Sequence, residues 1–197
     1  MKSMKKVLVL GAGRSSSSLI STLLARSESN GWEVHVGDVD LDTATLKCSG
    51  HPAAHPFEID PNDSSSRDAH IASSDLVISM VPAFMHPEIA EVAIEAGVSV
   101  ITPSYVSPQM KALHAKAVEA GVLILNEIGL DPGIDHLSAK AVLDRIADEG
   151  GEMLEFESYC GGLIAPESDD NPWHYKFSWN PRNVVLAGQG GAATFLS

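Results

Sequence analysis

Two glycines near the N-terminus have the spacing of a dinucleotide-binding turn. Gly11 and Gly13 follow the apolar run of residues 7–10, and apolar residues at helical spacing resume from Ser18. A buried strand, a glycine turn and a helix start can together bind a pyrophosphate, because the helix start offers unpaired N–H groups and the positive end of its dipole. Gly11 permits the turn, and Gly13 lets the backbone approach the phosphates without an intervening Cβ.

The residues that follow the second glycine complete the predicted cofactor site. Ser16 occupies the third position of the G-x-G-x-x-G pattern, and serine is small enough for close packing of the helix against the strand. Arg14 and Ser15 lie between Gly13 and Ser16. We therefore expect Arg14, Ser15 and Ser16 to line the cofactor together with the two glycines.

An aspartate at the end of the second predicted strand favours NAD. Asp38 follows the strand-like stretch 33–37. A carboxylate there can accept hydrogen bonds from the ribose hydroxyls and would repel the 2′-phosphate of NADP. No Lys or Arg lies between Asp38 and Leu46 to offset that charge. The sequence predicts NAD, with NADP less favoured, although Asp38 can also be interpreted as a solvated turn residue like Asp40.

Composition limits the classes of partner. The 197 residues are 44% hydrophobic, which is enough for a core, and carry a formal net charge of −13. That charge disfavours nucleic acid and anionic membranes, and no apolar run approaches the roughly 18 residues of a membrane span. We therefore expect a small-molecule substrate, no nucleic-acid partner and no membrane partner.

The cysteines and histidines give no metal or disulfide pattern. Cys48 and Cys160 are too few for a disulfide framework, which indicates a reducing, cytoplasmic compartment. The first six residues lead directly into the first strand, which leaves no room for a signal peptide. His51 and His55 lie among prolines and cannot share a helix face, so we expect no metal site.

Strands and helices alternate over the first part of the chain. This alternation predicts a doubly wound parallel sheet, the Rossmann architecture of the α/β class, over residues 1–136. Ser107 and Pro108 predict a helix start, and the polar stretch 60–66 is expected to be exposed. Strands are expected at residues 7–10, 33–37, 55–59, 75–81, 98–101 and 122–125, and helices at 18–24, 41–47, 89–96, 110–117 and 134–147.

The remaining residues, 137–197, are expected to begin a second domain of α+β type. Residues 152–160 alternate as a strand does, residues 163–179 indicate a long ordered loop, and the glycine-rich stretch 184–196 is a weak helix. These elements cannot bury a core alone. We therefore expect this second domain to be incomplete.

Three segments carry a resemblance to saccharopine dehydrogenases of the glutamate-forming type. They are residues 102–108, 126–136 and 158–179, and the last is long and unusual in composition. Members of that family are longer than this chain, so the resemblance implies a truncated chain. The chain departs from the family at Ser16, at Ile164 where proline is usual, and at Asp38, where NADP-dependent members tend to carry a basic residue nearby.

The resemblance implies hydride transfer between a nicotinamide and saccharopine, which interconverts saccharopine with L-glutamate and 2-aminoadipate 6-semialdehyde in lysine metabolism. It implies that Ser104, Tyr105 and Asp131 contact the substrate. Proton transfer at the reacting nitrogen requires an acid–base group, and the resemblance makes Asp131, Tyr105 and Cys160 the catalytic candidates. His136 is interpreted as a helix-start residue instead of a base.

The resemblance also implies further cofactor contacts and a dimer. Val81 and Leu130 are expected to line the cofactor, and Asn180 matches a position near it. The family forms a homodimer through its second domain. Each candidate has a simpler interpretation, since Asp131 precedes a proline in a turn, Tyr105 can be a packed loop aromatic and Cys160 a small buried hydrophobe.

Two other functions remain open at this stage. One is a polyamine-pathway imine reductase such as a carboxynorspermidine dehydrogenase, against which the segment from Tyr159 to Trp179 argues. The other is a non-catalytic NAD-binding module, because the fold by itself does not determine activity.

Overall fold

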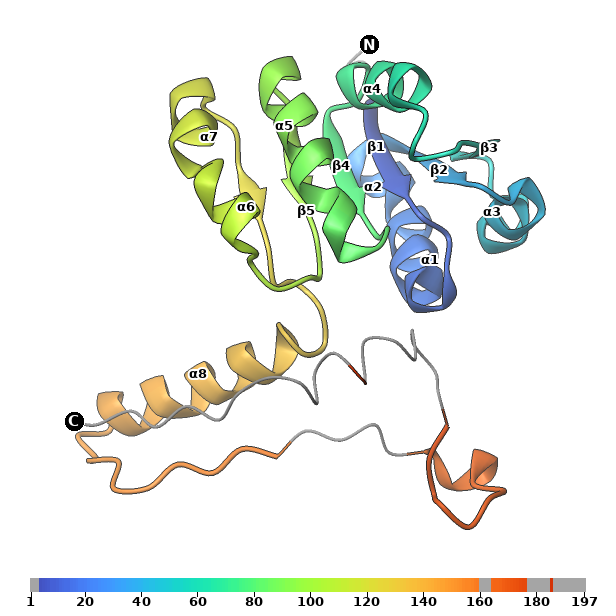
Figure 1. Ribbon diagram of the computed structural model, residues 1–197. Helices are drawn as coiled ribbons and strands as arrows, with labels where there is room; N and C mark the ends of the chain where they lie inside the picture. The colour runs from blue at the N-terminus through green and yellow to red at the C-terminus, as the bar shows by residue number, and fades with distance from the viewer. Residues whose placement is uncertain (1–3, 160–163, 177–184, 186–197) are drawn as a thin grey trace. The chain divides into compact units, whose positions relative to one another are not determined.

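The computed structural model describes residues 4–159, 164–176 and 185 (Figure 1). The chain divides into two compact units, Met1–Ser158 and Tyr159–Ser197. The first unit contains every strand of the described residues, and the described part of the second contains the short 3₁₀ helix Pro166–Ser168. Within the described residues, no helix is both long and apolar enough to cross a membrane.

A six-stranded sheet forms the centre of the first unit, in the order β3-β2-β1-β4-β5-β6. Its strand pairs are all parallel. From β1 the chain adds β2 and then β3 toward one edge of the sheet, and from β4 it adds β5 and then β6 toward the other edge. The direction of strand addition therefore reverses between β1 and β4. In open α/β sheets this switch point forms the ligand crevice at the carboxyl ends of the strands. The strands are β1 (Lys5–Leu10), β2 (Trp32–Asp38), β3 (Ala54–Glu58), β4 (Leu76–Ser79), β5 (Ser99–Ile101) and β6 (Ile124–Leu125).

Helices connect the strands and cover both faces of the sheet. The principal ones are α1 (Ser17–Ala25), α3 (Leu41–Cys48), α4 (Ser64–Ala72), α5 (His86–Ala96), α6 (Pro108–Ala112), α7 (His114–Ala120) and α8 (Ile134–Asp148). Shorter turns are α2 (Ser27–Asn30) and the 3₁₀ helices Arg14–Ser16 and Ala83–Met85. The predicted doubly wound α/β fold is therefore confirmed.

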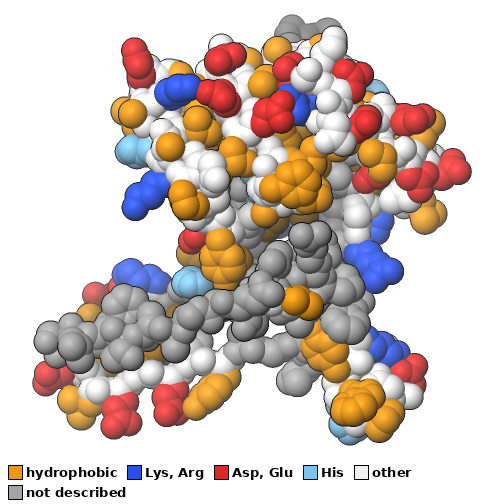
Figure 2. Space-filling model, in the orientation of Figure 1, with side chains coloured by type: hydrophobic (Ala, Val, Ile, Leu, Met, Phe, Trp, Pro, Cys, Tyr) orange, Lys and Arg blue, Asp and Glu red, His pale blue; other side chains and the backbone are white. Residues whose placement is uncertain are grey.

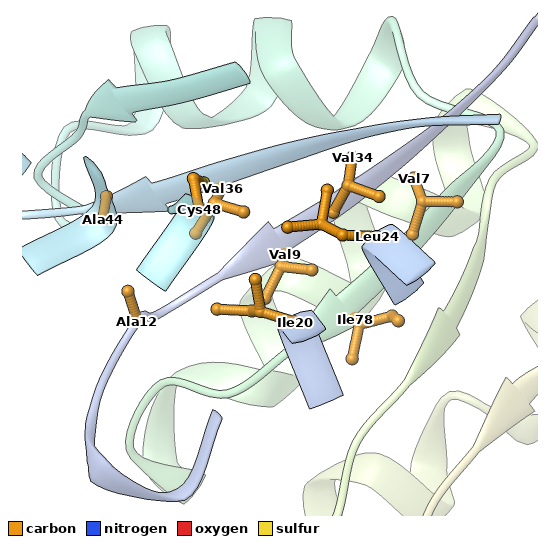
Figure 3. Packing of buried hydrophobic residues seen from close by; sticks show 10 residues of the cluster. All are labelled: Val7, Val9, Ala12, Ile20, Leu24, Val34, Val36, Ala44, Cys48 and Ile78. Atoms are coloured by element: carbon orange, nitrogen blue, oxygen red, sulfur yellow. The ribbon is translucent and has the colours of Figure 1, made fainter. Parts of the chain in front are cut away.

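Alternate residues of β1 face two different cores. Val7 and Val9 pack with side chains of α1 and α3, such as Ile20 and Ala44 (Figure 3). The intervening residues of β1 pack in a second cluster that includes Ile71 of α4 and other side chains from α5. A strand buried on both faces must be apolar at every position, which explains the uninterrupted run in the sequence.

Helix α4 was not expected from the sequence. Its N-cap is Asp63, whose carboxylate accepts a hydrogen bond from Ser66 N at 3.4 Å. Its buried residues are Ile71 and Arg67. The guanidinium of Arg67 lies 2.8 Å from a carboxylate oxygen of Glu88 on α5. This helix packs through one aliphatic residue and one ion-paired arginine. It therefore has little apolar periodicity, and the sequence pattern does not predict it.

Two other segments differ from expectation. The helix expected at 110–117 is two helices, α6 and α7, which meet at Leu113. Its predicted start is confirmed, because Ser107 Oγ accepts a hydrogen bond from Met110 N at 3.1 Å. Residues 152–159 form no strand: Leu154 is 85% exposed and no strand of the described residues pairs with this segment. The alternation of apolar and polar residues does not form a strand here, because no neighbouring strand in the part of the chain that the structure describes supplies hydrogen bonds.

Candidate active site

The glycine turn after β1 is built around a backbone contact with β4. Gly11 has a φ of +101°, which L side chains rarely adopt, and a Cβ there would lie 3.0 Å from the carbonyl atoms of Met80 and 3.2 Å from Val81 N. Gly11 N donates a hydrogen bond to Gly37 O at 2.8 Å. Only glycine fits this position. The contact places Val81 N beside the turn, and the cofactor contact predicted for Val81 stays a prediction.

Gly13 has a different role from Gly11. A Cβ at Gly13 would meet nothing within 4 Å, so protein packing does not require glycine there. Gly13, Arg14 and Ser15 are exposed, whereas Ser16 is buried and its hydroxyl donates to Gly13 O at 2.8 Å. The turn therefore has an open outer surface next to the N-terminus of α1. This arrangement fits a pyrophosphate, for which a Cβ at Gly13 would be an obstacle.

The carboxylate of Asp38 faces the glycine turn. Ala12 N donates a hydrogen bond to Asp38 Oδ2 at 2.6 Å, and Asp40 N donates to Oδ1 at 3.1 Å. Asp38 thus connects the turn after β1 to the loop after β2. The interpretation as a merely solvated turn residue is wrong, since both carboxylate oxygens bind backbone amides.

The ammonium group of a lysine from α3 lies beside the start of α1. The ammonium of Lys47, in the last turn of α3, donates a hydrogen bond to Ser17 Oγ. Lys47 directly follows Leu46, the end of the cation-free stretch that begins at Asp38. A positive charge is therefore present beside the predicted phosphate-binding turn.

Two predicted substrate residues meet in the loops after β5 and β6. Tyr105 donates its phenolic hydrogen to Asp131 Oδ1 at 2.9 Å, and its side chain is 63% exposed. This hydrogen bond, with neighbouring carboxylates, raises the pKa of Tyr105. The phenol is therefore a hydrogen-bond donor at neutral pH.

The loop that carries Asp131 is tightly folded. Gly129 N donates to Pro132 O at 2.8 Å, and Ile134 N donates to Gly129 O at 3.0 Å. Gly133 has a φ of +149°, and a Cβ there would lie 2.2 Å from Gly129 O. Leu130 is 71% exposed on this loop. Its predicted cofactor contact stays a prediction.

A buried histidine connects the two halves of the site. His86, in the first turn of α5, has an exposure of 2%. Its Nδ1 lies 2.9 Å from Ser79 Oγ at the end of β4. Its Nε2 lies 2.8 Å from Ser104 Oγ and 2.9 Å from Thr102 Oγ1, both just after β5. His86 thereby fixes the predicted substrate residue Ser104 relative to the strand end that contacts Gly11.

Burial keeps this histidine neutral. Desolvation lowers the pKa of His86 to about 4. At neutral pH one ring nitrogen therefore donates and the other accepts, which suits hydroxyl partners because these can do either. The sequence pattern does not indicate this network, since its members come from three separate segments of the chain.

His136 is placed as the sequence predicted, in the first turn of α8. Its Nδ1 lies 2.8 Å from Asp135 Oδ1, and this hydrogen bond is the largest cause of a raised pKa for His136. Cys160 and Asn180 lie outside the described residues, so the catalytic role of the first and the cofactor contact of the second stay predictions.

The strand order and the open glycine turn define a dinucleotide-binding domain of the Rossmann type. The sequence matches the saccharopine dehydrogenase NADP binding domain over residues 7–125 and the saccharopine dehydrogenase C-terminal domain over residues 129–197. The chain belongs to the saccharopine dehydrogenase family.

Individual relatives agree with this assignment. The chain is 42% identical over 191 residues to a saccharopine dehydrogenase [NADP(+), L-glutamate-forming] of Pyricularia oryzae, a match that covers 97% of this chain and 42% of that protein. It is 37% identical to the mitochondrial alpha-aminoadipic semialdehyde synthase of Mus musculus, covering 94% of this chain and 20% of that protein. The chain thus spans about two fifths of the length of its fungal relative.

A solved structure shows the same fold. The apo saccharopine dehydrogenase (L-Glu forming) from Saccharomyces cerevisiae superposes with a TM-score of 0.80 at 42% sequence identity. The superposition covers 93% of this chain and 40% of that chain.

The prediction of NAD as the preferred cofactor is wrong. The matching family domain is described as NADP binding, and the fungal relatives are named as NADP(+) enzymes. The error has two physical sources. The carboxylate of Asp38 accepts hydrogen bonds from Ala12 N and Asp40 N. The ammonium of Lys47, on α3, reaches Ser17 at the start of α1 and brings a positive charge to the turn.

Proposed function

We propose that the chain contributes the NADP-binding portion of a saccharopine dehydrogenase that interconverts saccharopine with L-glutamate and 2-aminoadipate 6-semialdehyde. The observation that carries this proposal is the 2.9 Å hydrogen bond between Tyr105 and Asp131 at the carboxyl edge of a sheet that also carries an open glycine turn. Family membership supplies the substrate class, since the relatives bear that name.

NADP would be held at the turn after β1. The exposed backbone of Gly13 and Ser15 and the N-terminus of α1 suit the pyrophosphate. We assign the 2′-phosphate to Arg14 and Lys47, because a phosphomonoester near Asp38 needs cationic partners. When bound, NADP supplies the hydride acceptor or donor at its nicotinamide.

Asp131 and Tyr105 would act on the substrate. A carboxylate binds an ammonium or secondary amine through a charge-assisted hydrogen bond, which gives Asp131 the role of holding the reacting nitrogen. The phenol of Tyr105 orients that carboxylate and can pass a proton to or from it. Ser104, positioned by His86, offers a hydroxyl to a substrate carboxylate.

The cofactor part is tested by nucleotide titration of the 197-residue chain, with nicotinamide fluorescence as the signal. We expect NADPH to bind more tightly than NADH, and Lys47→Ala to reduce that preference by about 10-fold, the equivalent of one charge-assisted hydrogen bond. Lys140→Ala, which changes an exposed lysine paired with Asp144 on α8, is the matched control. Equal affinity of the wild-type chain for both nucleotides contradicts the assignment.

The substrate part is tested by activity. Saccharopine should drive reduction of NADP by the protein, and related imines and amines from polyamine metabolism should not. Absence of saccharopine-dependent NADPH formation by a protein that binds NADPH contradicts the substrate but leaves the cofactor site standing.

The remaining parts of the proposal concern the assembly and its surroundings. We propose a homodimer in the cytoplasm, with residues 1–136 as the nucleotide domain and 137–197 as part of a second domain. The net charge of −13, and acidic side chains spread over the face shown in Figure 2, support a small-molecule partner instead of nucleic acid. Sedimentation of the protein at several concentrations measures the oligomeric state.

A further inference from the structure

Three side chains with metal-binding chemistry meet on β2 and β3. His35 of β2 is the register partner of His55 of β3. Glu33 precedes His35 by two residues and so projects from the same face of the sheet. This set was not visible as a pattern in the sequence, because the nearest histidine to His55 along the chain is His51, whereas its neighbour across the ladder is His35.

The ligand atoms have spacings close to those of a coordination shell. Glu33 Oε2 lies 3.5 Å from His35 Nε2 and 3.6 Å from His55 Nε2. One ligand atom from each of the three residues lies within 4.8 Å of the other two. Zinc with ligands at about 2.0–2.2 Å in a tetrahedron separates neighbouring ligand atoms by about 3.4 Å. The two distances from the carboxylate are therefore near the value that a bound ion requires.

The imidazole rings need a modest rotation to bind one ion. Their centroids are 4.5 Å apart with 24° between the planes, so the rings are stacked and their lone pairs do not yet converge. Rotation about χ2 splays the rings, and this torsion has a broad energy profile in histidine. The side chain of His55 is 46% exposed, which leaves space for its movement.

One of these ligand atoms is poorly satisfied within the protein. The Nε2 atom of His35 is buried, and its 3.5 Å contact with Glu33 Oε2 is too long or poorly aligned to be a good hydrogen bond. Buried polar atoms in native proteins are nearly always satisfied by protein, water or an ion. Binding an ion between His35, Glu33 and His55 satisfies this atom and keeps both rings within reach of the carboxylate.

The surroundings permit a cation. Lys6 on β1 is the register partner of Glu33, and it is the cationic side chain closest in the ladder to this set. Its ammonium donates a hydrogen bond to Ser73 Oγ at 2.8 Å, which holds it toward the end of α4. Glu33 supplies one negative charge, so a divalent ion there would be partly neutralised by its own ligand.

The site is separate from the nucleotide turn. Glu33 precedes Asp38 by five residues on the same strand, a distance of about 16 Å at about 3.3 Å per residue. The cluster therefore lies toward the amino ends of β2 and β3, whereas the cofactor turn lies at the carboxyl ends. An ion here would join the edge strand β3 to β2 and take no part in hydride transfer.

We propose that Glu33, His35 and His55 bind a divalent transition-metal ion, with zinc favoured by two imidazoles and one carboxylate. The three protein ligands leave a fourth tetrahedral position for water. The ion stabilises the β2–β3 edge of the sheet, and the proposal does not depend on the activity of the protein.

The test is titration of the 197-residue chain with Co²⁺ and Zn²⁺. Co²⁺ should give the intense visible absorption of a tetrahedral site with N and O ligands, and one equivalent of Zn²⁺ should remove it. His55→Gln and Glu33→Gln change exposed or half-exposed side chains, and each should weaken binding by more than the roughly 10- to 100-fold typical of losing an outer-shell partner.

The control is His51→Gln, which removes a histidine from the segment that directly precedes β3. His51 Nδ1 accepts a hydrogen bond from Ala53 N and is not one of the three ligands. Its substitution should leave the Co²⁺ spectrum and the affinity unchanged. Circular dichroism confirms that each variant is folded, and Zn²⁺ should raise the Tm of the wild type and of His51→Gln but not of the ligand variants.

Three results overturn the proposal. They are absence of a tetrahedral Co²⁺ spectrum, equal affinity in the wild type and the ligand variants, and loss of binding only in His51→Gln. Each indicates that Glu33, His35 and His55 do not together bind a metal ion.

Discussion

The buried histidine of α5 gives a quantitative prediction about pH. In His86→Gln the ring is replaced by an amide, which cannot titrate but can still donate and accept hydrogen bonds with a different geometry. The three hydroxyls that contact His86 in the wild type lose part of their hydrogen bonding, so the variant should be less stable at every pH. The informative quantity is the dependence of stability on pH.

The sign and size of that dependence follow from the pKa. Burial lowers the pKa of His86 from 6.5 to about 4, so the unfolded chain binds the proton more readily than the folded chain. Stability from this group is complete above pH 6.5 and is lost as the pH falls toward 4. Linkage gives a loss of about 1.3 kcal/mol between about pH 7.5 and about pH 5.5, and about 3 kcal/mol over the whole interval.

The assay is urea unfolding of the wild type and His86→Gln at both pH values, followed by circular dichroism. The wild type should lose about 1.3 kcal/mol more than the variant on acidification. Burial also lowers the pKa of His35 and His70, but both are present in both proteins and cancel in the comparison. His114→Gln, which changes an exposed histidine on α7, should keep the wild-type dependence.

Equal dependence on pH in the wild type and His86→Gln would refute the reasoning. It would mean that His86 keeps an ordinary pKa and that solvent reaches the ring. In that case Ser104 would not be fixed through a neutral imidazole, and its proposed place in the substrate site would lose its structural support.

Four further substitutions distinguish the parts of the site. Gly11→Ala should lower the free energy of unfolding by about 1–2 kcal/mol or more, since it adds a strained φ and a contact with Met80, as denaturant unfolding will show. Gly13→Ala should leave stability unchanged and weaken NADPH binding by about 10-fold, and unchanged binding contradicts the open-turn argument. Asp38→Ala should cost about 1–2 kcal/mol in unfolding, because a buried amide loses its acceptor. Tyr105→Phe should reduce saccharopine turnover by about 100-fold with NADPH affinity unchanged, and wild-type turnover removes the tyrosine from the mechanism.

The sequence predicted the structure correctly where local geometry requires a particular type of residue. The apolar run of β1 and the glycine at position 11 are required by burial on two faces and by a positive φ, so their pattern identified the Rossmann sheet and its turn. Ser107 and Pro108 identified a helix start for the same reason, since a cap needs particular side chains.

Features that depend on residues far apart in the chain were not predictable. The hydrogen bonds of His86 join residues separated by up to 18 positions. The metal-ligating set arises from strand register, which placed His35 opposite His55. The predicted preference for NAD was wrong because the distance of a cation along the chain does not give its distance in space: Lys47 reaches the turn through the packing of α3 beside α1.

The unequal lengths of the strand ladders have a dynamic consequence. β1 and β2 pair over six residues, whereas β5 and β6 pair over only two. Amide protons at the β6 edge should therefore exchange with solvent through local opening, while those of β1 exchange only when the whole domain unfolds. The loop that carries Asp131 follows this short ladder, so it is attached to the least stable edge of the sheet.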